Sequence, residues 1–247
     1  PDIARLARPG QFLMVKPSNG GDPLLRRPFS LFEILRDGTG AITGLSILNK
    51  RVGIGTGLLY DVKAGDRLSI LGPLGTPWTL PASGEAWFVA GGVGLAPFVT
   101  LAETCRAAGV AMRLFYGGRS ARDLYYASWF ADQGATLDLT TEDGSQGERG
   151  RVTAPLTRAL ESRDARRTPV TLYSCGPTPM MRAVADLGAA HGVPTFVSLE
   201  QVMGCGMGGC YSCVVPVGDA TAPHFVRSCL EGPVFDATRL VWDRLVH

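Results

Sequence analysis

The sequence has few histidines and almost no excess of charge of either sign. Only three of its 247 residues are histidine, and the formal net charge is +2. So small a charge gives no general electrostatic basis for binding nucleic acid or an anionic membrane surface. We also find no convincing pairing of a nucleophile with a base, so the residues do not point to covalent or acid–base catalysis.

Long apolar runs are scarce as well. The longest uncharged run lies between Glu85 and Glu103, and three glycines and a proline interrupt it. Its length is near the lower limit for crossing a bilayer, so we expect strand, turn and helix there instead of a membrane span. No secretory signal is visible. The chain starts at Pro1 and would enter a strand almost at once, so we expect an N-terminal piece to be missing or removed.

The six cysteines are not distributed like those of a disulfide scaffold. Four of them lie close together near the C-terminus, whereas Cys105 and Cys175 are far away. With 45% hydrophobic residues the chain can form its own core and does not need disulfide staples. This distribution favours an intracellular, cytoplasmic protein with a local metal site.

The spacing of the clustered cysteines suggests an iron–sulfur centre. The four are spaced C-x4-C-x2-C-x15-C, and they are Cys205, Cys210, Cys213 and Cys229. The first three spacings match plant-type [2Fe–2S] ferredoxins, whereas zinc ribbons usually have two C-x2-C knuckles. Gly206, Gly208 and Gly209 would let backbone N–H groups turn toward a negatively charged cluster. We favour a [2Fe–2S] cluster, with structural zinc and disulfides as alternatives.

Two different hydrophobic patterns divide the chain. Residues 1 to about 80 carry short apolar or alternating runs between Gly, Asp and Pro, which predicts a small antiparallel β-barrel. Farther on, strand and helix patterns alternate, which predicts a parallel sheet with helices on both faces. We therefore predict three domains: a barrel at 1–82, an α/β domain at 83–199 and a cysteine-bearing domain at 200–247.

Two glycine-containing loops of the α/β domain suggest a nucleotide site. "VAGGVGLAPF" follows a predicted strand and opens a predicted helix, so Gly92 and Gly94 would let the backbone approach a pyrophosphate. "YSCGPTPMM" has the same context and contains Cys175, Gly176 and Pro177. The first loop lacks the G-x-G-x-x-G spacing, and tight packing explains either loop alone. Both would lie at the carboxyl edge of one sheet, so together they predict a nicotinamide nucleotide.

Three other residues of this domain have two interpretations each. Cys175 would lie beside the nicotinamide ring or act as a small buried hydrophobic residue. Arg119, in "YGGRS", would contact a ribose or phosphate or be solvated. Cys105, in the middle of a predicted helix, is expected in the core.

The sharpest motif of the first domain is "RRPFS". The guanidinium of Arg27 suits a pyrophosphate. Phe29 can pack on a flavin ring, and the hydroxyl of Ser30 can hydrogen-bond the reactive edge of that ring. "VGIGTG" adds Gly55 and Thr56 as a second phosphate cradle. Taken singly, the two motifs also fit a basic turn and a glycine-rich turn.

In this order, "RRPFSL", "GIGTGLL", "GGVGLAPF", "CGPTPMM" and "CGMGGCYSCVV" resemble the ferredoxin reductase superfamily. The match is closest to the electron transfer subunits of dihydroorotate dehydrogenase B, and it covers nearly the whole chain. The resemblance implies an N-terminal FAD-binding barrel, an NAD-binding domain and a C-terminal [2Fe–2S] domain. FAD, a [2Fe–2S] cluster and NAD are therefore the expected cofactors.

The resemblance also assigns individual residues. The family's flavin motif is matched by Arg27, Pro28, Phe29 and Ser30. A second flavin-contacting stretch is matched by Leu48, Asn49 and Lys50. Asn49 stands where the family has an aromatic residue, and Trp78 receives no assignment. Gly55 and Thr56 match a pyrophosphate contact, and the four clustered cysteines match the cluster ligands. Ser30 is the candidate catalytic group, because it would assist flavin N5.

The function implied by the resemblance is electron transfer. An FMN-containing catalytic subunit would oxidise dihydroorotate to orotate in pyrimidine synthesis, and its electrons would pass through this chain's [2Fe–2S] cluster and FAD to NAD⁺. The expected assembly is a heterotetramer of two of each subunit. Two alternatives stay open. One is the small subunit of another NAD(P)H-dependent flavin/iron–sulfur oxidoreductase, of the ferredoxin:NADP⁺ or sulfide type. The other is a zinc-stabilised binding module without enzyme activity.

Two features bear on these alternatives. Small subunits of the ferredoxin:NADP⁺ or sulfide type can have aspartate in place of one cluster cysteine. The four cysteines here therefore favour a subunit of dihydroorotate dehydrogenase. Glu142 and Asp143 would repel the 2′-phosphate of NADP if they lay near the nucleotide, but the sequence does not place them.

Overall fold

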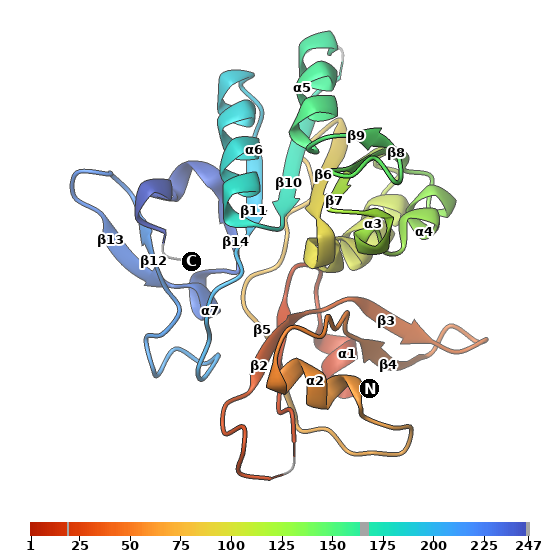
Figure 1. Cartoon of the computed structure of the whole chain (residues 1–247), viewed down its shortest axis with the longest axis vertical. Coiled ribbons are helices and arrows are strands. Elements are labelled where there is room, and N and C mark those ends of the chain that lie inside the picture. Colours follow the sequence, from red (N-terminus) through yellow and green to blue (C-terminus); the bar gives the residue numbers. More distant parts are fainter. Residues whose placement is uncertain (19, 164–167, 246–247) are drawn as a thin grey trace.

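The chain forms three regions that follow one another in sequence and pack side by side (Figure 1). The computed structural model describes residues 1–18, 20–163 and 168–245. The N-terminal region, red to orange, lies below the α/β region, and the C-terminal region, blue, lies beside both. The predicted boundaries at 82/83 and 199/200 stay predictions.

The N-terminal region contains five short antiparallel strands. They are β1 (Phe12–Val15), β2 (Arg27–Ser30), β3 (Glu33–Arg36), β4 (Ile42–Ser46) and β5 (Ile70–Leu74). One sheet has the order β2-β1-β5, and β3 pairs with β4 in the other. Leu31 N–H donates to Gln11 O, and Phe32 N–H donates to Ser46 O, so the chain passes from one sheet to the other between these residues. One apolar core lies between the sheets, as expected for a small barrel.

Two short helices of this region were not predicted. α1 (Asp2–Leu6) precedes β1, where we expected a strand at once, and α2 (Ile54–Tyr60) occupies the glycine-rich segment expected as a phosphate cradle or a turn. Thr56 Oγ1 accepts hydrogen bonds from the N–H groups of Val52 (2.9 Å) and Gly53 (3.0 Å). This cap stabilises the first turn of α2 despite two glycines. Helices of five and seven residues are too short to show a helical period in the sequence.

The α/β region is built on a seven-stranded sheet with the order β14-β11-β10-β6-β7-β8-β9. Its strands are β6 (Glu85–Gly91), β7 (Met112–Gly118), β8 (Thr136–Thr141), β9 (Glu148–Arg149), β10 (Val170–Cys175), β11 (Thr195–Ser198) and β14 (Val234–Asp236). All neighbouring pairs are parallel except β11 and β14. The strand order reverses between β6 and β10, and ligands bind at such a switch point in open α/β sheets.

Helices cover both faces of this sheet, as predicted. They are α3 (Val99–Ala107), α4 (Ala127–Asp132), α5 (Thr153–Ser162) and α6 (Thr178–Ala190), with 3-10 turns η1 (Gly92–Phe98) and η2 (Ala121–Asp123). Phe88 and Leu114 belong to the core that includes residues of η1, α3 and α4. Trp87 and Phe115 belong to the core that includes residues of α5 and α6. Within the described ranges, no helix combines the length and apolarity needed to cross a membrane.

The C-terminal region is small and is attached to both other regions. Its elements are β12 (Val214–Val217), β13 (His224–Arg227), α7 (Ser228–Glu231), η3 (Ala237–Arg239) and η4 (Trp242–Arg244). β12 and β13 form a hairpin, whereas β14 joins the α/β sheet as its antiparallel edge strand. Thr76 N–H donates to Gly232 O (2.6 Å), which fastens the end of the barrel to this region.

Trp78 joins the barrel to the α/β region. Its indole Nε1 donates to Pro97 O (3.1 Å), and its ring stacks on Phe98 at a centroid distance of 5.7 Å. The next residue, Thr79, accepts a hydrogen bond from the Tyr173 hydroxyl (2.7 Å). No role was predicted for this tryptophan, and in the structure it is a buried anchor between the regions.

Candidate functional site

Residues from the two flavin stretches and from α2 come together in the structure. A Cβ added to Gly55 would lie 3.0 Å from Arg27 Nε, so α2 packs directly against that side chain. Asn49 Nδ2 donates to the carbonyl oxygen of Thr56 (3.0 Å). Arg27, Asn49, Gly55 and Thr56, assigned from three separate stretches of sequence, are therefore neighbours.

A buried acceptor in this group has no protein partner. Asn49 Oδ1 is buried and, within the described residues, makes no hydrogen bond. The amide is held through its Nδ2, so the free oxygen has a fixed direction. Leaving such an atom unpaired costs about 1–3 kcal/mol, which a donor of a bound ligand would recover. The residues here therefore fit a flavin, whose ring and ribityl chain carry such donors.

The guanidinium of Arg27 is also fixed in place. Its Nη1 donates to the carbonyl oxygens of Leu25 (2.9 Å) and Arg26 (3.2 Å). The rest of the motif continues along β2, with Pro28, Phe29 and Ser30 all partly buried. Phe29 packs against the barrel core, and its contact with a flavin ring stays a prediction.

Leu48 and Lys50 lie at the boundary with the α/β region. Leu48 packs against the core of that region. Lys50 Nζ forms an ion pair with Asp123 Oδ1 at 2.9 Å, which lowers the pKa of the Asp123 carboxyl. Beside it, the Tyr126 hydroxyl donates to Glu33 Oε1 (2.6 Å), and this hydrogen bond raises the pKa of Tyr126 to about 12. The end of the flavin stretch thus ties the barrel to η2.

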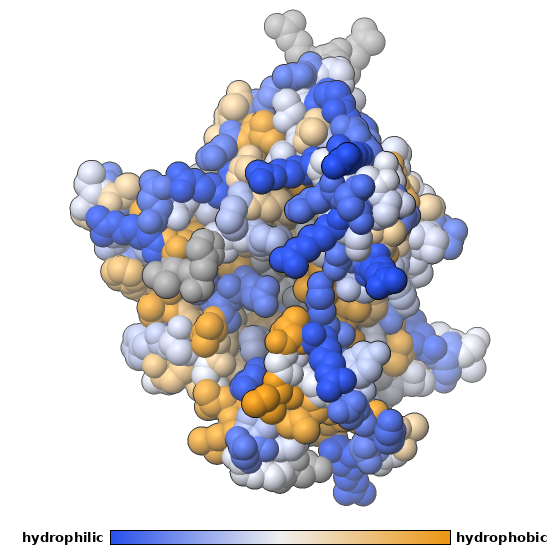
Figure 2. All heavy atoms as spheres, viewed as in Figure 1, coloured by the Kyte–Doolittle hydropathy of each residue, from blue (hydrophilic) through white to orange (hydrophobic). Residues whose placement is uncertain are grey.

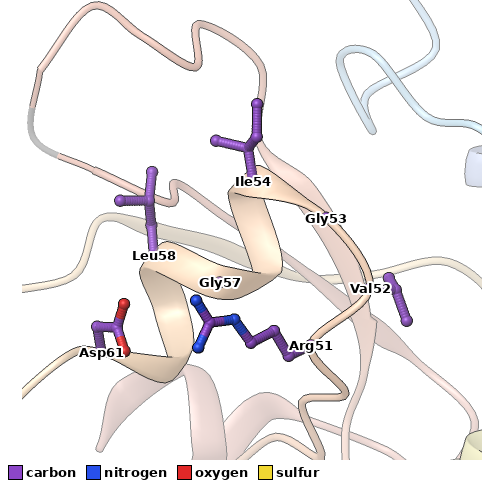
Figure 3. A pocket seen from close by; sticks show the side chains of 7 residues that line it. All are labelled: Arg51, Val52, Gly53, Ile54, Gly57, Leu58 and Asp61. Atoms are coloured by element: carbon purple, nitrogen blue, oxygen red, sulfur yellow. The ribbon is translucent and has the colours of Figure 1, made fainter.

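A surface pocket of about 640 Å³ runs along α2 (Figure 3). Its lining residues are Arg51, Val52, Gly53, Ile54, Gly57, Leu58 and Asp61. Ile54 and Leu58 extend from the same side of the helix, and the Arg51 guanidinium lies beside Gly57. A Cβ at Gly57 would lie 3.5 Å from Arg51 Nε. Sequence reasoning missed Arg51 as a second cation besides Arg27. The signal that could have found it is a basic residue directly before the glycine-rich segment.

Hydrophobic residues gather over the lower part of the face shown in Figure 2, where α2 lies in Figure 1. Val52 is 76% exposed and Ile54 is 81% exposed. The surface around the pocket therefore combines a guanidinium with apolar side chains.

The two glycine loops meet at the ends of β6 and β10. A Cβ on Gly94 would lie 2.6 Å from the carbonyl carbon of Cys175 and 2.7 Å from the Cα of Gly176. A Cβ on Gly91 would lie 2.8 Å from Pro177 Cδ. The backbones approach so closely that side chains do not fit between them. Both loops thus line the carboxyl edge at the switch point, as the alternating pattern predicted.

Tyr116 supports the first of these loops. Its buried hydroxyl lies 2.9 Å from Gly92 O and 3.0 Å from Asp123 O, and it accepts a hydrogen bond from Tyr125 N–H (3.0 Å). Burial raises the pKa of Tyr116, so the phenol stays protonated and donates. Gly92 itself has φ +54, a conformation that favours glycine. Sequence reasoning missed Tyr116 because its partners become neighbours only in the folded sheet.

Cys175 and Arg119 occupy different environments at this edge. Cys175 is 8% exposed, and burial raises the pKa of its thiol to about 12, so it is not a nucleophile. Arg119 is exposed after β7, and its carbonyl oxygen accepts from Asp143 N–H (3.1 Å). Glu142 N–H donates to Gly118 O (3.1 Å), so the acidic pair lies beside Arg119.

The cysteine loop is pressed against the barrel and α7. A Cβ on Gly206 would lie 2.5 Å from Met14 Cγ, and one on Gly208 would lie 2.6 Å from Leu230 Cδ1. Both glycines have positive φ, +73 and +82. Gly209 has neither a close neighbour nor a positive φ, so neither packing nor backbone conformation requires glycine there, and the direction of its N–H stays a prediction.

The four clustered cysteines lie close enough together to shift one another's pKa. Hydrogen bonds with Ser212 and then with Cys205 lower the pKa of Cys210 to about 6. Burial and then a hydrogen bond with Cys213 raise the pKa of Cys229 to about 11, and Cys205 also acts on it electrostatically. In the described parts of the chain, no group of three His, Cys, Asp or Glu side chains is arranged so that it could hold a single metal ion. Four neighbouring thiols suit a two-iron cluster, which takes four cysteine ligands.

The remaining cysteine, Cys105, is completely buried in α3, as expected for a core residue.

Comparison with known families gives two matches. Residues 200–241 match the iron–sulfur cluster binding domain of dihydroorotate dehydrogenase B, and residues 88–186 match an oxidoreductase NAD-binding domain.

Individual relatives extend over nearly the whole chain. The dihydroorotate dehydrogenase B (NAD(+)) electron transfer subunit of Desulforamulus reducens is 40% identical, over 98% of this chain and 90% of its own. That of Geobacillus thermodenitrificans is 39% identical, over 97% and 89%. Among solved structures, an NADH-dependent reduced ferredoxin-NADP oxidoreductase has a TM-score of 0.83 at 28% identity, covering 99% of this chain and 83% of that one. The chain therefore belongs to the family of dihydroorotate dehydrogenase B electron transfer subunits.

Proposed function

We propose that this chain carries electrons from an FMN-containing partner subunit, which oxidises dihydroorotate to orotate in pyrimidine synthesis, to NAD⁺. Its relatives carry the name of this electron transfer subunit. When bound, a [2Fe–2S] cluster carries one electron, nicotinamide accepts a hydride, and FAD exchanges one or two electrons, so FAD belongs between the other two.

The observation that carries the proposal is that the barrel contacts both other regions. Cys213 and Cys229 pack in one apolar cluster with Phe12 and Met14 of β1. The barrel also contributes Phe32 to the core of the α/β region. A flavin held by the barrel would therefore be bound by the region that contacts both the cysteine loop and the α/β region.

At the flavin, Arg27 would bind the pyrophosphate with Gly55 and Thr56, and Asn49 Oδ1 would accept a donor of the cofactor. Ser30, at the end of β2, would hold a hydrogen bond at flavin N5, with Pro28 and Phe29 shaping the strand beside it. Leu48 and Lys50 would complete this side of the site.

At the nucleotide, Gly92 and Gly94 would admit the NAD pyrophosphate, and Arg119 would contact its ribose or phosphate. Cys175, Gly176 and Pro177 would lie beside the nicotinamide. The protonated thiol of Cys175 would pack there without carrying charge.

At the cluster, Cys205, Cys210, Cys213 and Cys229 would be the ligands. Cys210 is exposed, whereas Cys213 and Cys229 are 2% exposed, so the partner would approach from the Cys210 side. Exposed apolar residues occur in the cysteine loop, just before it and in α7 beside Gly208, and they are Val202, Met207, Tyr211 and Leu230. We propose that the FMN-containing subunit docks on this surface.

The full assembly would be a cytoplasmic heterotetramer of two of each subunit. All six cysteines are free thiols in the structure, which suits a reducing compartment.

The experiment is to purify the chain without oxygen, record its visible spectrum, and add NADH. Flavin bands with an iron–sulfur shoulder, both bleached by NADH, are the expected result. A colourless protein with stoichiometric zinc would overturn the proposal in favour of a zinc-stabilised binding module.

A second candidate is a ferredoxin:NADP⁺-type small subunit, which the TM-score of 0.83 to such an oxidoreductase favours. The two differ in partner. Dihydroorotate-dependent reduction of NAD⁺, after mixing with the catalytic subunit, is expected only for the first function.

Replacing Arg27 with methionine is expected to weaken FAD binding about 10- to 100-fold, because hydrogen bonds to charged groups contribute about 1.5–3 kcal/mol. This affinity is measured by titrating the whole chain, freed of FAD, with FAD and monitoring flavin fluorescence. Arg26→Met is the matched control, since Arg26 donates to the carbonyl and hydroxyl oxygens of Ser69 instead. Equal losses of FAD affinity in both variants would contradict the assignment of Arg27 to the FAD site.

A further inference from the structure

Ser212 connects the backbone of the cysteine loop to the thiol of Cys210. The N–H group of Gly204 donates to Ser212 Oγ at 2.8 Å. The same hydroxyl oxygen lies 3.2 Å from Cys210 Sγ, within hydrogen-bond distance. The hydroxyl is thus held between a backbone donor and a sulfur atom.

The direction of the second hydrogen bond follows from the chemistry of a ligand. In the free thiol either Ser212 or Cys210 can donate. A cysteine bound to iron is a thiolate and has no proton to give. Ser212 must then donate, while its oxygen goes on accepting from Gly204. The result is a directed relay from Gly204 N–H through the Ser212 hydroxyl to Cys210 Sγ, in which each hydrogen bond polarises the next.

Gly204 also leaves the space that the relay needs. A Cβ at this position would lie 3.2 Å from Cys210 Sγ and 3.4 Å from Ser212 Oγ. These distances are tight, so a side chain at residue 204 would press on both atoms. Cys210 is moreover the exposed member of the four cysteines, so burial does not hold its sulfur atom in a fixed environment.

We propose that Ser212 is a positioning residue that hydrogen-bonds the Cys210 thiolate and thereby raises the reduction potential of the cluster. The inference rests on the proposed function, because it takes Cys210 as a cluster ligand. A donor to a ligating sulfur stabilises the more negative, reduced state, and hydrogen bonds to sulfur are among the factors that set cluster potentials. The relay makes the cluster a better acceptor for the electrons of the partner's flavin.

The test compares Ser212→Thr with Ser212→Val, two variants of the same shape that differ in the hydroxyl. The midpoint potential of the cluster is measured by EPR-monitored redox titration of the anaerobic holoprotein, with iron content determined for each sample. We expect Ser212→Thr to keep the potential of the unsubstituted protein and Ser212→Val to shift it to a more negative value. The flavin potential should stay the same in both.

The outcomes separate the relay from the proposed function. If fully loaded Thr and Val variants both kept the cluster potential of the unsubstituted protein, the role of Ser212 would be overturned while the cluster assignment stayed intact. A shift of the same size in both would also overturn it, because the cause would then be shape and not the hydroxyl. An unsubstituted chain that binds no iron and shows no [2Fe–2S] EPR signal would instead overturn the proposed function.

Discussion

Replacing Cys229 with alanine is expected to abolish iron binding while leaving the flavin and nucleotide sites active. Cys229 is 2% exposed and packs with Phe12 and Met14, so no water or surface side chain can take its place. It also comes from α7, outside the loop that carries the other three cysteines. Iron analysis should show loss of both irons, and dihydroorotate-dependent reduction of NAD⁺ should disappear. NADH oxidation by a dye that accepts electrons from FAD should continue.

Cys105→Ala is the matched control for this experiment. Cys105 is also a buried free thiol, but it lies in α3 within the core of the α/β region. This variant should keep its iron and its full electron transfer. Full iron content in Cys229→Ala would exclude Cys229 from the ligand set, and loss of iron in both variants would point to a general loss of structure.

The features that the sequence predicts are those encoded by local pattern. Trp87 and Phe88 point to opposite faces of β6 and enter different cores, as the alternation of a strand requires. Helix α3 ends at Ala107, and Gly109, just past the cap residue Ala108, has φ +69, the conformation that favours glycine after a helix end. The two glycine loops occur at strand ends, and the structure brings them together because both strands are central in the sheet.

The features that were missed depend on contacts between distant residues. β14 has three residues, and only its pairing with β11 makes it a strand of the α/β sheet. Trp78 gains its role from Pro97 and Phe98, which belong to the next region. Asn49 departs from the family pattern, and its unpaired Oδ1 becomes visible only when its Nδ2 partner is known. Hydrophobic period and motif spacing carry no information on such pairings.

Replacing Gly94 with alanine is expected to separate the two nucleotide loops. The added Cβ would lie 2.6 Å from the carbonyl carbon of Cys175 and 2.7 Å from the Cα of Gly176, and neither backbone atom can rotate away. Overpacking of this kind costs about 1–3 kcal/mol, and here it acts directly on the site. We expect a lower free energy of unfolding and at least about tenfold weaker NADH binding, since 1.4 kcal/mol corresponds to a factor of ten. Denaturant unfolding and NADH titration measure the two effects.

Gly38→Ala separates this steric effect from the general consequence of replacing a glycine. Gly38 lies in the turn between β3 and β4, has no neighbour within 4 Å of an added Cβ, and lacks a positive φ. An alanine there should leave NADH affinity unchanged and stability nearly so. If Gly94→Ala instead bound NADH as tightly as Gly38→Ala, the close approach of the loops would not be needed for binding. The nucleotide would then have to contact the sheet edge elsewhere, beyond β7, where Arg119 and Asp143 lie side by side.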